Sequence, residues 1–513
     1  SGSGSVKLTA SDRSTIDADA AGIGIMLKFG QGSGANAGLG IGVALNDIQN
    51  GISAVVEDST VSAYQDVSLI AESITTVNAL SIGGAVNGVI GKGDGFNLAG
   101  GGAGTKNLIK NTIDAHIKNS EGQSGPGVEA KNGTVTVSAT DDSTIVSDAG
   151  GVGVSVKIGG GNALNLAIGI GVAVNDIANN IYATVDHSVV VGDDVEITAH
   201  SGSSIDTLSI GAAGALNIST GKSNSLDLGV GAAVSYNHIE NTVEAVIKGG
   251  SDVTADSGDI TVSATDGSDT DRTLINADAG GVAISIAIGV GKGSRAAITA
   301  GVAVSENTVR NTVKSYIENS KADAKGALSV TATSDAKIDS YSLGAAGSLT
   351  VSVGSGASGA VGVAYVGTKN VVENTVKAYI SGSVDETDDT KPGIQAGSGG
   401  ITVKADDFTE VLAEWVGVSV SVALGVGKGT AIAGSVTVVL AENTIDNEVA
   451  AYAKDSKLDS DGAITVEAIS DHNLEATGVG VSASLAIQVS KVPISLSVSA
   501  LVVSTTNTCL LYT

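Results

Sequence analysis

Large, aromatic and conformationally constraining side chains are scarce in this sequence. The 513 residues include 3 Pro, 1 Cys, 1 Met and 1 Trp, and aromatic residues make up 3% of the chain. An ordinary globular core of this length relies on Phe, Tyr, Trp, Leu and Met, because large side chains fill a rounded interior. Their scarcity argues against such a core. The single cysteine, Cys509, permits no disulfide within the chain.

Basic residues are also few. The chain has 27 Lys and Arg against 54 Asp and Glu, which gives a formal net charge of −27. Such a surface repels nucleic acid and anionic lipid head groups, so we expect no nucleic-acid partner and no insertion into a membrane. The apolar stretches are interrupted by Gly and Ser and are too short for a transmembrane helix. No segment resembles a signal peptide, and we expect targeting signals to lie outside this sequence.

What the chain has in abundance is Gly and small or branched aliphatic residues, arranged in repeats. Gly occurs 71 times, and 42% of the residues are apolar. A strand-like signature, in which two alternating apolar residues precede an alanine, occurs eight times, beginning at Val6, Val67, Val135, Val195, Ile260, Leu328, Ile401 and Ile464. Internal repetition of this kind indicates a repeat architecture.

A second signature, Asn-x-x-x-Asn, occurs seven times and sets the spacing of the repeats. Its pairs are Asn46 and Asn50, Asn107 and Asn111, Asn175 and Asn179, Asn237 and Asn241, Asn307 and Asn311, Asn370 and Asn374, and Asn443 and Asn447. An eighth copy is expected near Asn507. Successive second Asn residues are separated by 61, 68, 62, 70, 63 and 73 residues, so short and long steps alternate. The true unit is therefore a doublet of about 130 residues.

These spacings predict the domain organisation. The repeat boundaries are 1–65, 66–132, 133–193, 194–257, 258–326, 327–399, 400–462 and an incomplete 463–513. Within a unit, Val282, Ile284, Ile286 and Ile288 alternate with Ala, Ser and Gly, and a period of 2 is that of a β-strand. A face of Ala, Ser and Gly requires another backbone very close by. The sequence predicts an all-β, elongated repeat protein, either a parallel β-solenoid or stacked β-layers, in which the Val and Ile rows are buried.

The Asn pairs are candidates for either architecture or binding. Asn residues four apart in a strand would face the same way and could hold a metal or a sugar. Because they recur in every unit, we interpret them as an Asn ladder or a turn-capping device that satisfies backbone groups. A binding site usually needs only one copy.

Candidate sites for chemistry are weak. We find no catalytic arrangement and expect no enzyme, although parallel β-helices can host paired carboxylates that cleave glycosides. No cofactor is expected beyond possible calcium, for which Asp266, Asp269, Asp271, Asp459 and Asp461 are the candidates, because alternating carboxylates in turns suit hard cations. Asp and Gly are also simply good turn residues. An outer-membrane β-barrel remains an alternative, since strands of about 10 residues match a membrane span, but aromatic girdles are lacking.

The sequence Asn-Thr-Val-x-Ala-Tyr-Ile occurs at 374–380, with a near copy at 311–317. It resembles the repeats of giant bacterial surface proteins. These are the filamentous-haemagglutinin-like and leukotoxin-type filamentous adhesins. The resemblance implies secretion, an extracellular or cell-surface location, and an elongated β-solenoid used in adhesion or biofilm cohesion. We therefore expect a structural fibre, stalk or sheath that associates with itself. The alternative is an adhesin whose repeats bind a host or matrix glycan.

Overall fold

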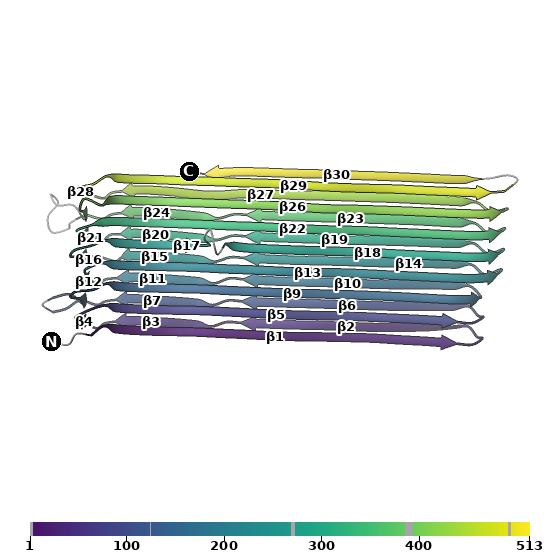
Figure 1. Cartoon of the computed structure of the whole chain (residues 1–513), viewed down its shortest axis with the longest axis horizontal. Helices are drawn as coiled ribbons and strands as arrows, with labels where there is room; N and C mark the ends of the chain where they lie inside the picture. Colours follow the sequence, from purple (N-terminus) through teal and green to yellow (C-terminus); the bar gives the residue numbers. More distant parts are fainter. Residues whose placement is uncertain (1–3, 124, 268–271, 385–392, 491–493, 513) are drawn as a thin grey trace.

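The computed structural model consists of β-strands that are paired in parallel, and it describes residues 4–123, 125–267, 272–384, 393–490 and 494–512. No helix occurs in these ranges. The strands form three sheets, which we call A, B and C (Figure 1). The all-β, parallel-strand prediction is confirmed.

Sheet A contains the longest strands, and their order in the sheet follows the sequence. They are β1 (Val6–Phe29), β5 (Val67–Ile90), β9 (Val135–Gly160), β13 (Val195–Gly221), β17 (Ile260–Asp266), β18 (Thr273–Gly291), β22 (Ala327–Gly354), β26 (Gly400–Gly427) and β29 (Ile464–Val489). β17 and β18 share one position, because both pair with β13 and β22. Most are 24 to 28 residues long, so the expected strand length of about 10 residues is wrong.

The strands of sheet B run antiparallel to those of sheet A. In most passes of the chain through sheet B, a short break divides the strand into two, so the sheet has two rows of strands. Its first row comprises β2 (Gly34–Ile48), β6 (Gly95–Ile109), β10 (Ala163–Ile177), β14 (Ser225–Ile239), β19 (Arg295–Val309), β23 (Ser358–Val372), β27 (Ala431–Lys454) and β30 (Ser495–Tyr512). Its second row comprises β3 (Gly51–Glu57), β7 (Thr112–Lys118), β11 (Asn180–Asp186), β15 (Thr242–Lys248), β20 (Thr312–Glu318) and β24 (Thr375–Ser381). The continuous β27 joins the two rows.

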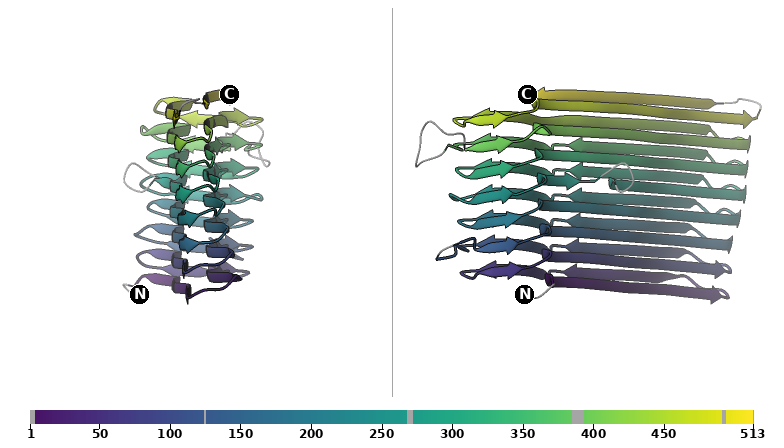
Figure 2. Two further views of the ribbon diagram at one scale, coloured as in Figure 1. Left: turned by 90° about the vertical axis from the view of Figure 1, so that its right-hand side faces the viewer. Right: turned by 60° about the vertical axis from the view of Figure 1, so that its left-hand side comes forward.

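Sheet C is short and closes one end of the cross-section. It comprises β4 (Val61–Ala63), β8 (Val128–Ala130), β12 (Val189–Gly192), β16 (Asp252–Ala255), β21 (Lys321–Ala324), β25 (Ile394–Ala396) and β28 (Leu458–Ser460). The chain thus passes from sheet A to B to C and back to A, and each A strand lies beside the previous one (Figure 2). Equivalent signature residues pair directly, as in Val6 with Val67 and Val67 with Val135.

Two regions follow one another along every long strand. The root lies near sheet C, where three sheets surround a wide interior filled by Val, Ile and Leu, for example Ile197, Ile181 and Val190, all fully buried. The lobe is the remainder of sheets A and B, where these two sheets face each other alone. In sheet A it runs from the register position shared by Ala20, Ser81, Ala149, Ser209, Ala279, Ser342, Trp415 and Gly478 to the strand ends.

At the register position of Gly211 the two backbones of the lobe approach so closely that only glycine fits between them. A Cβ atom added to Gly211 would lie 1.8 Å from the carbonyl oxygen of Ala232, and one added to Gly281 would lie 1.8 Å from that of Val302. The register position of Gly211 is glycine in all the paired sheet A strands: Gly22, Gly83, Gly151, Gly211, Gly281, Gly344, Gly417 and Gly480. The small-residue face predicted from the sequence is therefore the inner face.

Since strand side chains alternate, the bulky residues of the lobe point outward. Ile284 is 52% exposed and Val290 is 58% exposed. The expectation that the Val and Ile rows are buried holds in the root and is wrong in the lobe. The physical reason is the small separation of the two sheets, which leaves little room for branched side chains inside the lobe. Val366 and Val439 are exceptions, and they pack with Trp415 at the border of the lobe.

Candidate functional site

The first Asn of each pair forms a continuous ladder through the interior. The Nδ2 atom of each donates to the Oδ1 atom of the next, over distances of 2.7 to 2.9 Å, from Asn46 through Asn107, Asn175, Asn237, Asn307, Asn370 and Asn443 to Asn507. An amide can donate and accept at once, so one residue per strand satisfies its neighbours on both sides. This is the geometry of an Asn ladder.

In six of the seven pairs the second Asn lies between the two rows of sheet B rather than within a strand, so the picture of both Asn residues in one strand is wrong there; it holds for Asn443 and Asn447, which both lie in β27. Its Oδ1 atom accepts from the backbone N–H of the preceding copy, as in Asn111 to Asn179 at 2.7 Å. Its Nδ2 atom crosses the interior to sheet A, where Asn179 contacts Asp141 at 2.7 Å and Ser143 at 3.0 Å. These side chains bridge sheets A and B at the border of the root.

The sheet A residues that receive this second row alternate between carboxylate and hydroxyl. Along the stack they are Asp12, Ser73, Asp141, Ser201, Asp266, Ser334 and Asp407, and Ser470 continues the alternation at the same register position. Alternation places neighbouring carboxylates about 9.6 Å apart instead of about 4.8 Å. At an effective dielectric constant near 20, that lowers the repulsion between two charges from about 3.5 to about 1.7 kcal/mol. The alternation of Asp and Ser thus reduces the repulsion between ionised carboxylates along this row.

The buried carboxylates titrate abnormally. Burial raises the pKa of Asp141 to about 6, although hydrogen bonds from Ser143, Ser73 and Asn179 oppose the shift. Burial likewise raises the pKa of Asp266 to about 6, against hydrogen bonds that include Thr273 and Asn311. Water is a better solvent for a carboxylate than this interior, and the amide donors replace it only in part.

The calcium candidates are not brought together. Asp266 ends strand β17, is fully buried, and accepts hydrogen bonds from Thr273 and Asn311. Asp459 and Asp461 are exposed in and beside β28. Asp269 and Asp271 lie outside the described residues. Within the ranges that the structure describes, no group of three or more His, Cys, Asp or Glu residues is placed to hold a metal ion.

Two further ladders at the far end of the lobe were not predicted. Inside the lobe, Asn36, Asn97 and Asn165 lead to Asp227, through hydrogen bonds of 3.1, 2.7 and 2.6 Å. Burial raises the pKa of Asp227 to about 7, while Arg295 and Lys157 oppose the shift. Recurrence at steps of 61, 68 and 62 residues is a signal that could have found this ladder.

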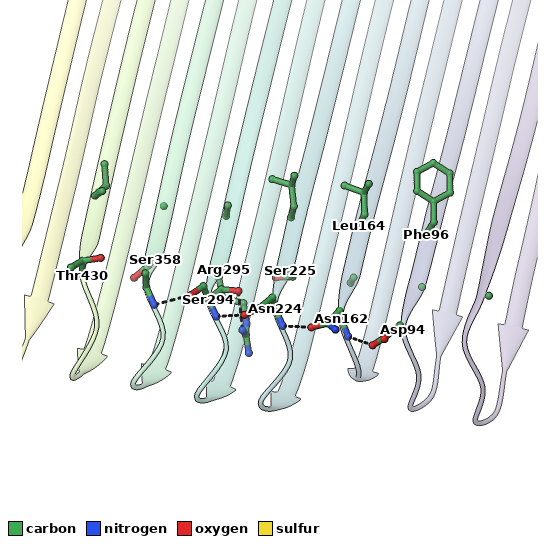
Figure 3. Close-up of a pocket in the computed structure, with 18 residues that line it drawn as sticks. Asp94, Phe96, Asn162, Leu164, Asn224, Ser225, Ser294, Arg295, Ser358 and Thr430 are labelled. Carbon is green, nitrogen blue, oxygen red and sulfur yellow. Dashed lines mark hydrogen bonds between the residues drawn. The ribbon is translucent and has the colours of Figure 1, made fainter.

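The second unpredicted ladder caps the turns between sheets A and B. Side-chain oxygens accept from the backbone N–H of the next turn, from Asp94 to Asn162 at 2.6 Å, from Asn162 to Asn224 at 2.9 Å, and from Asn224 to Ser294 at 2.8 Å. These residues are exposed. They form one wall of a groove of ≈ 850 Å³ that runs along the stack, with Phe96, Leu164, Leu226, Ala296, Gly359 and Ile432 in its lining (Figure 3).

The most extensive surface feature is the pair of apolar outer faces of the lobe. We call the outward side of sheet A in the lobe the A face and the outward side of the first row of sheet B the B face. On inner strands of the stack, exposed A-face residues include Ile82, Val86, Val152, Ile210, Ile284, Val353 and Val420, and exposed B-face residues include Ile170, Ile298, Val361, Val436 and Leu440. Exposed apolar patches larger than roughly 600 Å² are uncommon on soluble monomers and indicate interaction surfaces.

Comparisons with known proteins give no relatives: no family model matches the chain, and no curated protein or solved structure is detectably similar. In the part of the chain that the structure describes, no helix is long and apolar enough to cross a membrane.

Proposed function

We propose that this chain is a non-catalytic structural segment of an extracellular or cell-surface protein, forming part of a fibre, stalk or sheath that serves adhesion or biofilm cohesion and associates with itself. We also propose that it is a β-solenoid of about eight repeat units, arranged in doublets. The observation that carries this proposal is the strand-by-strand recurrence of the same buried positions, above all the unbroken Asn ladder from Asn46 to Asn507. Such a stack is stabilised by nearest-neighbour contacts and can be lengthened by adding repeats.

The outermost strands support extension and self-association. Among the described residues, β1 pairs with β5 alone in sheet A, and β29 pairs with β26 alone. A strand with one unpaired edge is a template for another strand. Further repeats or further copies of the chain can therefore continue each sheet at the same spacing.

Electron microscopy and fibre diffraction of the purified chain test this function. Straight filaments or rods with an axial spacing of about 4.8 Å are expected. Compact, isolated particles over a wide range of concentrations would contradict it. Imaging with and without a calcium chelator decides the calcium question, since dissolution by the chelator would establish calcium as a ligand.

A second candidate function is glycan binding by the repeats, and the exposed turn ladder favours it. Asp94, Asn162 and Asn224 present polar side chains at one position per turn, beside the groove. Binding of an immobilised glycan array that is lost on substitution of Asn162 and Asn224 by Ala would support it. The aliphatic lining of the groove offers one aromatic ring, Phe96, on which a sugar could stack.

A further inference from the structure

The A face has a relief that alternates from strand to strand. At the register position that follows the border of the lobe, Ile82 and Ile210 are exposed at 43% and 39%, whereas Gly150 and Gly280 have no neighbour within 4 Å of an added Cβ atom. Along the stack the order is Ile82 in β5, Gly150 in β9, Ile210 in β13 and Gly280 in β18, so bulky and small residues alternate. The next strand, β22, carries Leu343 at this position.

The two neighbouring rows of the A face alternate in the opposite sense. Val152 and Val282 are bulky where Ala212 and Ala345 are small. One row further, Val154 and Ile284 are bulky, whereas Gly214 and Gly347 are small, and Gly214 again faces open space. In these three rows the central strands β9 to β22 therefore carry projections and depressions with a period of two strands, or about 9.6 Å. The two rows beyond them do not alternate: one consists of Val156, Leu216, Ile286 and Leu349, and the other of Ile158, Ile218, Ile288 and Val351.

A surface with this period is complementary to itself under one simple symmetry. A two-fold axis that runs parallel to the strands, between β13 and β18, brings β13 against β18 of a second copy and β9 against β22 of that copy. The axis keeps each row opposite itself. When the strand positions of sheet A are counted from β1, it places odd positions opposite even positions, and we call these odd and even strands. In the three alternating rows, all six contacts among the four central strands then pair a bulky residue with a small one: Ile210 with Gly280, Gly150 with Leu343, Val152 with Ala345, Ala212 with Val282, Val154 with Gly347, and Gly214 with Ile284. In the two rows beyond, aliphatic side chains of both copies meet, as in Leu216 with Ile286.

The same symmetry also arranges the charges at the border of the A face. There the residues alternate as Asp148 in β9, Leu208 in β13, Asp278 in β18 and Tyr341 in β22. Exchange of odd and even strands places Asp148 opposite Tyr341 and Asp278 opposite Leu208 of the second copy. No carboxylate of this row then faces another, which matters for two copies that each carry a formal charge of −27.

The size of the A face is sufficient for a stable pair. The lobe part of sheet A is about ten residues wide and eight strand positions deep, which corresponds to about 33 Å by about 38 Å, or roughly 1,250 Å². Specific interfaces bury about 800 Å² per partner. Its aliphatic side chains on a flat parallel sheet also suit sheet-on-sheet packing, in which two inner faces interdigitate at about 10 Å.

We propose that the A face is the contact surface between two copies of this chain, which pair face to face about a two-fold axis parallel to the strands, with odd strands opposite even strands. This proposal rests on the proposed function, because it names the surface through which self-association occurs. It concerns lateral pairing, which is separate from growth along the stack.

Sedimentation analysis of the whole chain in detergent-free buffer tests the proposal, with a matched control. Ile210 on the A face and Ile170 on the B face are both 39% exposed. Ile210→Lys is expected to weaken lateral pairing at least about tenfold in Kd, because two lysines would be buried in the contact. Ile170→Lys is expected to leave pairing unchanged, and circular dichroism checks that both variants fold.

A compensating pair of substitutions tests the alternation itself. Gly280→Ile is expected to weaken pairing, because the new side chain would meet Ile210 of the second copy, while the open space over Gly280 lets the variant fold. Adding Ile210→Gly to that variant is expected to restore pairing, because a bulky residue again meets a small one. A double variant that pairs no more tightly than Gly280→Ile alone would overturn the proposed symmetry.

Other outcomes are equally decisive. A chain that stays monomeric but floats with neutral phosphatidylcholine vesicles would overturn the proposal in favour of a lipid-covered face. Pairing that is lost in Ile170→Lys and retained in Ile210→Lys would overturn the choice of face. If filaments with the axial spacing of about 4.8 Å form but no variant alters their lateral association, this inference fails while the proposed function stands.

Discussion

In both the root and the lobe, side chains alternate between the two faces of each strand, but the bulky residues face inward in the root and outward in the lobe. In the root, branched side chains such as Ile197 point inward and polar ones such as Glu196 point outward. In the lobe, Gly211 points inward and Ile210 outward, on the same strand. The difference is the distance between sheets: sheet C holds A and B apart in the root, whereas they touch in the lobe. A β-pattern therefore indicates two faces, and the space available decides which face is buried.

The largest expected effect comes from widening the lobe. Gly211→Val places a side chain against the backbone of Ala232, which cannot rotate away, and the cost should exceed about 4 kcal/mol. Hydrogen exchange and urea unfolding measure it, as local loss of protection in β13 and β14. The control is Gly214→Val on the outer face of β13, where an added Cβ meets nothing within 4 Å; equal destabilisation by both variants would refute the close-contact explanation.

The next effect is the loss of a side chain from the root core. Ile197→Ala should reduce the free energy of unfolding by about 2–5 kcal/mol, because Ile197 is fully buried and its removal leaves a cavity. Ile170→Ala, at an exposed position in the lobe, should cost less than about 1 kcal/mol. Urea midpoints of the two variants make the comparison, and similar losses would mean that the lobe surface is buried in solution.

The third effect depends on pH. Because the pKa values of Asp141 and Asp266 are raised to about 6 in the folded chain, above the ordinary value, the folded state binds more protons than the unfolded state between about pH 4 and 6. Stability should therefore increase as the pH falls through about 6, by on the order of 3 kcal/mol per carboxylate. Urea midpoints at about pH 5 and about pH 7.5 measure this. Asp141→Ser, which copies the neighbouring strands, should reduce the pH dependence.

The smallest effect is a break in the Asn ladder. Asn175→Ala removes a donor to Asn237 and an acceptor for Asn107, and the unpaired amides left behind should cost about 1–3 kcal/mol. Thermal unfolding measures the loss. Asn175→Gln keeps the amide but displaces it by one methylene, and rescue by Gln would show that burial of an amide, rather than its position in the ladder, is what matters.

The sequence predicted the strands, the repeats and a close approach of backbones, but it did not reveal the length or orientation of the strands. The segment around Ser201 and Ser203 in β13 consists of short polar residues and carries no apolar alternation that would extend a strand through it. In the structure both hydroxyls face Asn241 across the interior, at 3.0 and 2.9 Å, and the strand continues. A contact between residues about 40 positions apart has no local signal.

The candidate site was likewise predictable only in part. The two Asn rows recur seven times, at alternating short and long steps, so the sequence alone was enough to select them. The ladder through Asn97 and Asn165 recurs in fewer strands and ends at Asp227, so its signal in the sequence is weaker. The apolar A face could not be foreseen, because a row of Val and Ile in a strand is normally the buried row.

The carboxylates that occupy every second strand of sheet A also restrict how a gene for this protein can change in length. Deletion or duplication of a single repeat would bring two carboxylates or two hydroxyls to adjacent strands, depending on which repeat changes, and would also interrupt the alternation of projections in the central rows of the A face. Recombination that adds or removes two repeats preserves both patterns. Natural length variants should therefore differ by even numbers of repeats, so the alternation constrains the history of the gene as well as the shape of the chain.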